Sequence, residues 1–365
     1  MTPAHPVTRG AAVPPLPGRP GGPALPELAE LLEGSVVVRL PMTVRFRGVQ
    51  EREAMLLCGP HGWAEFSPFP EYGPQESAAW LAAAIEAGWQ GWPEAVRESV
   101  PVNATVPAVD AADVESLLAR YGESITAVKV KVAEHSPAGG LVPGSHAADL
   151  ARVRRVRELL PDAQIRIDAN AGWTLDDALV MLHELADVEL EYAEQPVPGI
   201  GPLAQLRHAL RDRGITTRIA ADEAVRKAGD PLAVAAAHAA DLIVVKVQPL
   251  GGVRRAAAIV AATGLDAVVS SALDTSVGIA GGAALAGHLP RLPHACGLGT
   301  AALFTDDVVT PAWVPRGGFL PVPGASAPQV DPDALRQCRA DEPRQQWWRE
   351  RLAAAHAVLA GQGQP

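Results

Sequence analysis

The sequence predicts an α/β fold in which parallel strands close into a barrel, and three observations lead to that prediction. The chain has 365 residues, more than one compact sandwich usually holds. From Val100 onward, short apolar β-like runs alternate with helix-like segments, as in sheets whose strands are covered by helices on both faces. Eight such runs occur, which is the strand number of the commonest α/β barrel.

The spacing of the runs indicates a repeating unit of one strand and one helix. Polar residues near the strand ends follow one another at intervals of 37, 26, 28, 24 and 25 residues, from Lys131 to Ser271. Each interval accommodates a strand, a helix and two loops. We therefore expect the barrel within residues 100–300, with strands at 102–106, 127–132, 164–168, 188–194, 218–222, 242–247, 267–271 and 293–298.

The segments on either side of the barrel are expected to form an α+β capping domain. Residues 26–99 are its N-terminal part, and residues 301–365, helical around 332–359, are expected to pack back on it. Residues 1–25 are interrupted throughout by Pro and Gly and are predicted to be a flexible leader. Within 26–99, β-type runs occur at 35–41, 44–48 and 54–58, and a helical pattern occurs at 77–87.

Charge and composition exclude several classes of partner. A formal net charge of -10 argues against binding to nucleic acid or to an anionic membrane surface. No apolar run approaches the roughly 20 residues that a membrane-spanning helix needs, and the arginine-rich stretch 152–157 is interpreted as a solvated helix face. Three scattered cysteines without CxxC spacing indicate a reducing compartment, so we expect a cytoplasmic protein.

Three carboxylates close successive strands of the predicted barrel. Asp168, Glu194 and Asp222 end the third, fourth and fifth strands, and strand ends of that kind form the active site of a parallel barrel. Carboxylates that converge at one mouth repel one another unless a hard cation lies between them. The sequence therefore predicts a Mg²⁺ site, with Mn²⁺ as the alternative. Any single carboxylate could instead cap a helix or form a surface ion pair, and Glu223 remains a rival of Asp222.

Lysines flank this predicted metal site on two sides. Lys129 and Lys131 alternate with valines in the second strand, so both are expected to face the barrel interior; the alternative is an exposed strand with solvated lysines. Two neighbouring ammonium groups lower each other's pKa, which suits a lysine base. Lys246 lies in the sixth strand, across the barrel. A metal between two lysines suits removal of a proton α to a carboxylate.

The last two strand ends offer groups that could hold a substrate carboxylate. The seventh strand ends in Ser270 and Ser271, and the eighth is followed by Gly297 and Gly299. Hydroxyl and backbone N–H groups at these positions are predicted to bind the substrate, a small carboxylate. The oligomeric state expected for the chain is a monomer or a small homo-oligomer.

Several short motifs together resemble the enolase superfamily and, within it, the muconate lactonising subgroup. They are KVK at Lys129, DAN at Asp168, EQP at Glu194, DE at Asp222 and KVQPLGG at Lys246. Further motifs are similar to those of o-succinylbenzoate synthases of the actinobacterial type. They are RFRG at 45–48, PVNATVP at 101–107, SSALDTSVG at 270–278 and GLGTAALFTDDV at 297–308. The resemblance covers residues 26–330.

This resemblance implies a fold, a cofactor and a reaction. The fold is a TIM-like (β/α)7β barrel beneath a capping domain, with Mg²⁺ on the three carboxylates; superfamily sites use a Lys or His base with one or two Mg²⁺ ions. The reaction is that of a hydro-lyase, a carbon-oxygen lyase of menaquinone biosynthesis. It is the syn-elimination of water from 2-succinyl-6-hydroxy-2,4-cyclohexadiene-1-carboxylate, through an enediolate, to give o-succinylbenzoate.

The resemblance also implies residue roles. Lys131 would remove the α proton and return it to the departing hydroxyl, Lys246 would stabilise the enediolate, and Lys129 would tune Lys131. Supporting positions behind these groups are Arg166, Asn170 and Glu223, and Arg47 lies in a cap loop over the substrate.

Two other functions compete with the synthase. An N-acylamino acid racemase or related epimerase would use the same two lysines as alternate acid and base. Dipeptide epimerases of the subgroup resemble one another in an acidic DxD motif on the eighth strand. This chain has GLGT there, which argues against an epimerase. A non-catalytic barrel would be expected to lose at least one carboxylate or lysine, whereas all five are present.

Overall fold

The computed structural model describes residues 12–361 except 47–48, 123, 136–139 and 228. Its main sheet has seven parallel strands, and their order along the sheet follows the chain from β5 to β11. The strands are β5 (Ala104–Val106), β6 (Ala127–Lys131), β7 (Gln164–Asp168), β8 (Tyr192–Glu194), β9 (Ile219–Ala221), β10 (Leu242–Val245) and β11 (Asp266–Val269).

The eighth position of the ring is filled by a short extended segment. Cys296 forms a parallel bridge with Val102, just before β5, and Gly297 forms one with Ser270, just after β11. The two edges of the sheet are thereby joined, and the expected barrel of eight parallel positions is confirmed. The eighth run was expected as a strand over 293–298, but in the structure it is only this pair of bridges.

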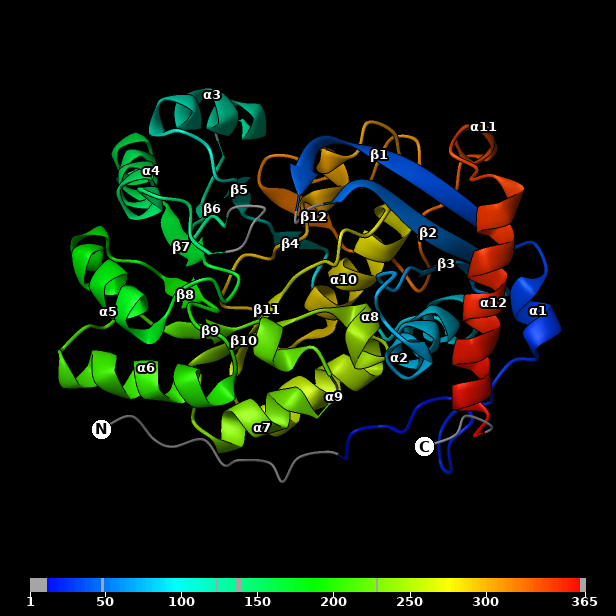
Figure 1. Ribbon diagram of the computed structural model, residues 1–365. Coiled ribbons are helices and arrows are strands. Elements are labelled where there is room, and N and C mark those ends of the chain that lie inside the picture. The colour runs from blue at the N-terminus through cyan, green and yellow to red at the C-terminus, as the bar shows by residue number, and fades with distance from the viewer. Residues whose placement is uncertain (1–11, 47–48, 123, 136–139, 228, 362–365) are drawn as a thin grey trace.

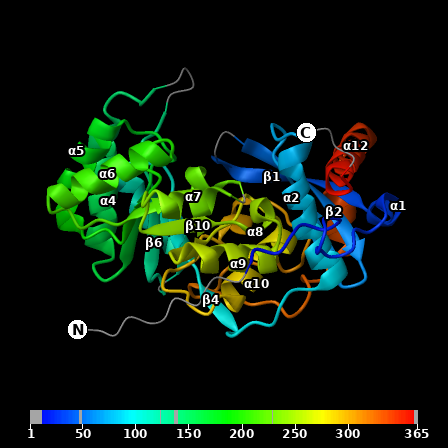
Figure 2. The same ribbon diagram turned by 90° about the horizontal axis from the view of Figure 1, so that it is seen from below.

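One helix follows each of the seven strands and covers the outside of the sheet (Figures 1 and 2). A short additional helix, α8 (Val247–Leu250), directly follows β10. Some strands begin later than predicted; in the run 188–194, for example, Glu189 adopts a left-handed backbone with φ 55° and prevents an extended start. The covering helices are α3 (Val114–Leu118), α4 (Ser145–Leu159), α5 (Leu175–Glu184), α6 (Ile200–Asp212), α7 (Asp230–Ala236), α9 (Val253–Thr263) and α10 (Ser276–His288).

The capping part is an antiparallel sheet, β1 (Val36–Phe46), β2 (Val49–Gly59) and β3 (Gly62–Phe66), in that order. The runs expected at 35–41 and 44–48 form one strand, β1, as far as Phe46, with an irregularity between Pro41 and Phe46; residues 47–48 lie outside the described part, and β3 was not predicted. Helices α1 (Leu28–Leu32) and α2 (Pro74–Ile85) belong to the same part, and a π-helical turn (Glu86–Gln90) continues α2.

The C-terminal tail returns to this sheet, as the sequence predicted. Helix α12 (Glu342–Leu359) lies beside α2 and β1 (Figure 1), and Trp348 on it is fully buried, with its ring edge-to-face 5.9 Å from that of Phe66. Before α12, the tail forms β12 (Phe319–Pro321), which pairs with β4 (Ser99–Pro101), and α11 (Pro332–Gln337). The domain boundaries themselves stay predictions.

Two surface interpretations of the sequence need correction. Residues 12–25 were expected within a flexible leader, but Arg19 Nη2 donates a hydrogen bond to the carbonyl of Val358 at 2.9 Å, and the carbonyl of Pro14 accepts one from Arg255; residues 1–11 lie outside the described part. Arg152, expected on a solvated face, is 3% exposed because it points from α4 toward β6 and donates to the carbonyl of Lys131 at 2.8 Å. No helix in the described ranges could span a membrane.

Two buried carboxylates of the cap bind the N-termini of barrel helices. Glu65 of β3 accepts hydrogen bonds from Thr275 N at 3.0 Å, Thr275 Oγ1 at 2.6 Å and Gly278 N at 3.1 Å, all at the start of α10. Glu86 accepts from the first backbone N–H groups of α9, including Arg254 N at 3.1 Å. Helix N-termini have unpaired donors and partial positive charge, so each carboxylate fixes the cap to the barrel.

The Glu65 contact predicts how stability depends on pH. Burial raises the pKa of Glu65 to about 7 from 4.5, and Asp274 adds to the rise, whereas Ser67, Thr275 and Arg52 oppose it. Folded Glu65 therefore holds a proton that the unfolded chain has lost, so its contribution to stability is complete below pH 4.5 and is lost as the pH rises through 7. With Glu65→Gln this dependence disappears. From about pH 5 to pH 8, wild type should lose on the order of 2 kcal/mol of unfolding free energy relative to the variant.

Urea unfolding followed by circular dichroism at both pH values measures this difference. The control is Glu53→Gln in the same sheet, because the pKa of Glu53 is lowered: burial acts to raise it, but hydrogen bonds from Arg344 and Trp348 outweigh burial. The contribution of Glu53 is therefore lost toward acid and is constant from pH 5 to 8. The prediction would be contradicted if the free energy of unfolding changed by the same amount between pH 5 and pH 8 in wild type and in Glu65→Gln.

Candidate active site at the barrel mouth

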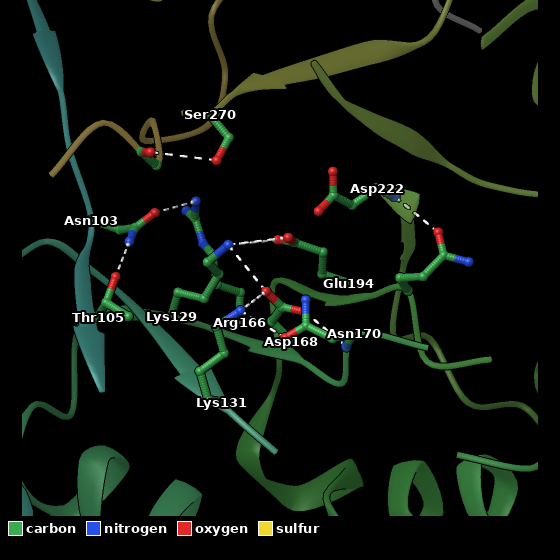
Figure 3. Close-up of polar contacts among 12 residues, drawn as sticks. Asn103, Thr105, Lys129, Lys131, Arg166, Asp168, Asn170, Glu194, Asp222 and Ser270 are labelled. Carbon is green, nitrogen blue, oxygen red and sulfur yellow. Dashed lines mark hydrogen bonds and ion pairs between the residues drawn. The ribbon is translucent and has the colours of Figure 1, made fainter. Parts of the chain in front are cut away.

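The register of the barrel places three carboxylates side by side. Asp168 ends β7, Glu194 ends β8 and Asp222 follows β9, and Asp168 is the direct neighbour of Glu194 across the two strands. Figure 3 shows all three turned toward the same interior space. They are 0%, 1% and 2% exposed. Carboxylates this buried must be balanced by positive charge.

The pKa of Glu194 reflects this crowding. Burial raises the pKa of Glu194 to about 7, Asp168 and Asp222 raise it further by repulsion, and Lys129 opposes them. The three carboxylates therefore act as one electrostatic unit, in which each additional cation favours the ionised form.

Three lysine ammonium groups are the counter-charges. Lys129 Nζ lies 3.0 Å from Glu194 Oε1 and 3.3 Å from Asp168 Oδ2. Lys131 forms an ion pair with Asp168, and Lys246 forms one with Asp222. The lysines of β6 and the lysine after β10 thus approach the carboxylates from opposite sides of the barrel.

The expected lowering of the lysine pKa is wrong for Lys129. Burial acts to lower the pKa of Lys129, but attraction by Glu194 and Asp168 is stronger, so the pKa lies above its ordinary value. Lys129 is therefore a fixed cation. The sequence placed the lysines in the interior but could not show how closely the carboxylates approach them.

The carboxylates suit a hard divalent cation by their chemistry. Among the described residues no three His, Cys, Asp or Glu side chains form a ready ligand cluster, and oxygens of all three carboxylates bind the lysines. The donor set nevertheless consists of three oxygen ligands that are buried and adjacent, and such ligands are those that Mg²⁺ uses in proteins. These residues fit the ion.

Polar neighbours orient the charged groups. Asn170 Oδ1 accepts from Lys131 Nζ at 2.9 Å, while Asn170 Nδ2 donates to Glu223 Oε1 at 3.2 Å. Glu223, the rival ligand, is thus engaged by Asn170 and also by Arg226, whereas Asp222 faces Lys246. Gln195, which was not predicted from the sequence, also belongs to the site: its Oε1 accepts from the backbone N–H groups of Asp222 and Ala224, each at 3.0 Å. The sequence did offer a signal for Gln195, because it directly follows Glu194 in the EQP motif.

Arg166 lies deeper in the barrel than the carboxylates. It is fully buried, donates to the carbonyl of Ala295 at 2.7 Å and forms an ion pair with Glu191. Its guanidinium also lies over the ring of Tyr192, 4.9 Å from the centroid. Arg166 therefore ties β7 to β8 and to the segment that closes the ring, and it supports the site from below.

Two hollows reach the lysines from either side of Phe69 and Ala272, which line both. The larger reaches Lys246 between the cap and the loop after β9. The smaller is lined by Lys129 and Lys131 together with the four predicted substrate-binding residues, Ser270, Ser271, Gly297 and Gly299. Arg47 lies outside the described residues. The smaller hollow also has a polar lining that the sequence analysis did not assign to the substrate: Asn103, Thr105, Tyr121 and Thr300.

Comparison with known proteins assigns the family. Residues 110–328 match the enolase C-terminal domain-like family and residues 37–88 the enolase N-terminal domain-like family. The o-succinylbenzoate synthase of Mycolicibacterium smegmatis is 52% identical over 331 residues, which are 90% of this chain and 97% of that protein. The o-succinylbenzoate synthase of Mycobacterium tuberculosis is 48% identical over 331 residues, 90% of this chain and 95% of its own.

Solved structures agree on the fold. The muconate lactonizing enzyme from Pseudomonas fluorescens, complexed with muconolactone, superposes with a TM-score of 0.69 at 20% identity and covers 84% of this chain and 98% of its own. An enolase from Streptomyces coelicolor, described as a putative sugar isomerase, gives a TM-score of 0.68 at 22% identity, covering 83% and 95%. With half of its residues shared with the mycobacterial proteins over nine tenths of its length, the chain belongs to the o-succinylbenzoate synthases of the enolase superfamily.

Proposed function

We propose that the protein is an o-succinylbenzoate synthase, which removes water from 2-succinyl-6-hydroxy-2,4-cyclohexadiene-1-carboxylate during menaquinone biosynthesis. One observation carries the proposal: three buried carboxylates lie between the lysines of β6 and Lys246, in a chain 52% identical to a synthase of that name. The geometry suits a carbon acid whose conjugate base carries charge on a carboxylate. The enzyme is a hydro-lyase.

Lys131 is the proposed base. It takes the α proton from the ring carbon, and the electron pair of that C–H bond moves into the substrate carboxylate to form an enediolate. When the ring C–O bond breaks, the departing hydroxyl takes the proton from Lys131 on the same face, so the elimination is syn and yields an aromatic ring and water. Asn170, which binds Lys131 Nζ at 2.9 Å, holds the amine in place.

The other charged groups stabilise the enediolate. Lys246 faces the ring from the opposite side, and Lys129 remains a cation below Lys131 because Glu194 and Asp168 hold its proton. A Mg²⁺ or Mn²⁺ ion on Asp168, Glu194 and Asp222 would supply positive charge to the substrate carboxylate. Superfamily members use divalent metals of this type.

The remaining wall of the smaller hollow suits the succinyl carboxylate. The hydroxyls of Ser270 and Ser271 and the backbone at Gly297 and Gly299 line it, and Ser271 Oγ already contacts Thr300 Oγ1 at 2.7 Å. Neutral donors of this kind bind a carboxylate without adding a cation that would compete with the lysines. A cytoplasmic location, suggested by three free cysteines, and a monomer or small homo-oligomer complete the proposal.

A racemase acting on N-acylamino acids is the second candidate. The observation that favours it is the opposition of Lys131 and Lys246 across the carboxylates, because racemisation needs an acid and a base on opposite faces. The chain has glycines and Thr300 rather than paired acids in the wall after the eighth strand position.

Direct assay of the purified protein separates the two candidates. With Mg²⁺ and the cyclohexadiene substrate, ultraviolet absorbance should show the aromatic product, and EDTA should abolish its formation until Mg²⁺ is restored. N-succinyl amino acids in deuterated water, followed by NMR, are the parallel test for racemisation. Rapid α-deuterium exchange without aromatisation would replace the synthase by the racemase.

Removal of the proposed base should stop turnover. Lys131→Ala is expected to lower kcat by at least about 10³-fold, since general-base catalysis contributes roughly 10²–10⁴, while calorimetric Mg²⁺ binding stays close to wild type because the carboxylates remain. Lys227→Ala is the comparison variant: the side chain of Lys227 is 70% exposed, pairs with Glu76 and lines the larger hollow, not the smaller one that Lys131 lines. Equal activity of the two variants would refute the role of Lys131.

A further inference from the structure

Arg52 of β2 touches both walls of the substrate hollow. On the barrel side, its Nε donates to the carbonyl of Leu273 at 3.1 Å and its Nη2 reaches the carbonyl of Ala272 at 3.5 Å. On the cap side, it donates to the carbonyl of Ser67, and its guanidinium lies 4.4 Å from the ring centroid of Phe69. Phe69, Ala272 and Leu273 line the hollow that holds Lys129 and Lys131.

The barrel wall that Arg52 binds has an unfavourable backbone. Leu273 has φ 60°, in the left-handed region that a residue with a branched side chain rarely adopts. Such a conformation persists where its surroundings hold it in place. The carbonyl of Leu273 is held by Arg52, and the loop after it is held by Glu65 through Thr275 N at 3.0 Å. Both contacts come from the cap.

The charge of Arg52 is balanced locally. Arg52 is 3% exposed, and this burial lowers the pKa of its guanidinium, while attraction by Glu65 and Asp274 opposes the lowering. Asp274 also accepts from Ala272 N at 3.1 Å, within the same loop. A buried guanidinium can make several hydrogen bonds from a planar fork, whereas an ammonium group cannot span the same distance in two directions. The cap and the barrel wall therefore share one rigid cation.

We propose that Arg52 is a positioning residue for the synthase: it fixes the distance between Phe69 of the cap and the Ala272–Leu273 wall, and so sets how the substrate fits above the lysines. The inference rests on the proposed function for the identity of the ligand. Its structural part, the order of residues 270–275, is independent of that function.

The test compares Arg52→Met and Arg52→Lys with Arg344→Met. Arg344 is a matched control, because it also stacks on an aromatic ring, 4.2 Å from the centroid of Trp347, and binds a carboxylate, Glu53, but lies in the cap away from both hollows. Amide hydrogen exchange reports the order of 270–275 in the free protein. Calorimetry with o-succinylbenzoate and Mg²⁺, and KM and kcat, report the fit of the ligand.

Arg52→Met should speed exchange at 270–275 by about tenfold or more and raise both the Kd for o-succinylbenzoate and KM about tenfold, with a smaller fall in kcat. Arg52→Lys should give exchange rates, Kd and KM between those of wild type and Arg52→Met, because it keeps the charge beside Glu65 but loses the planar guanidinium. If Arg52→Met does not fold, Arg52→Lys is compared with wild type instead. Arg344→Met should lower Tm only.

Unchanged exchange, Kd and KM in an Arg52 variant with a lowered Tm would overturn the inference. Wild type that neither binds nor forms o-succinylbenzoate would overturn the proposed function, and exchange at 270–275 would still decide the role of Arg52.

Discussion

The repulsion among three buried carboxylates is the constraint on which the rest of the site depends. The parallel register of β7, β8 and β9 brings the ends of these strands side by side, and with them Asp168, Glu194 and Asp222. Water cannot solvate them, so cations must. The lysines place positive charge at these oxygens, the backbone N–H of Asn170 donates to Asp168 Oδ1 at 3.0 Å, and Gln195 fixes the turn that carries Asp222. Even the fully buried Arg166 serves this arrangement, because it ties together the strands that carry the carboxylates.

Lysine and arginine occupy different kinds of position in this protein. The chain has 27 arginines and four lysines, and three of those lysines meet the buried carboxylates. Arginine cannot lose its proton in a protein, whereas lysine can when its surroundings change. Permanent cations such as Arg52 and Arg166 accordingly bind carbonyl groups of the framework. Three of the four lysines thus lie at the carboxylates, whereas these arginines belong to the framework.

The sequence predicted the parts of the molecule that depend on local pattern. Alternating strands and helices gave the barrel, and residues at strand ends gave the carboxylates and lysines, since period and register are both local properties. It did not predict Phe69 as part of the pocket wall, or Arg52 and Glu65 as contacts of the loop behind that wall, because they meet the barrel only when the cap docks on it. The exposure of Arg152 was predicted wrongly for the same reason. Helical spacing shows which residues share a face, but it does not show that Arg152 donates a hydrogen bond to the carbonyl of Lys131. The role of each site residue stays a prediction.

Two lysines of one strand, two residues apart, differ through depth alone. Lys129 lies between Glu194 and Asp168, where two carboxylates hold its proton firmly. Lys131 is one step nearer the mouth, where it forms an ion pair with Asp168 and donates a hydrogen bond to the neutral Asn170. The period-two alternation of a strand thus places two lysines on one side of the strand at different depths, where they meet different partners.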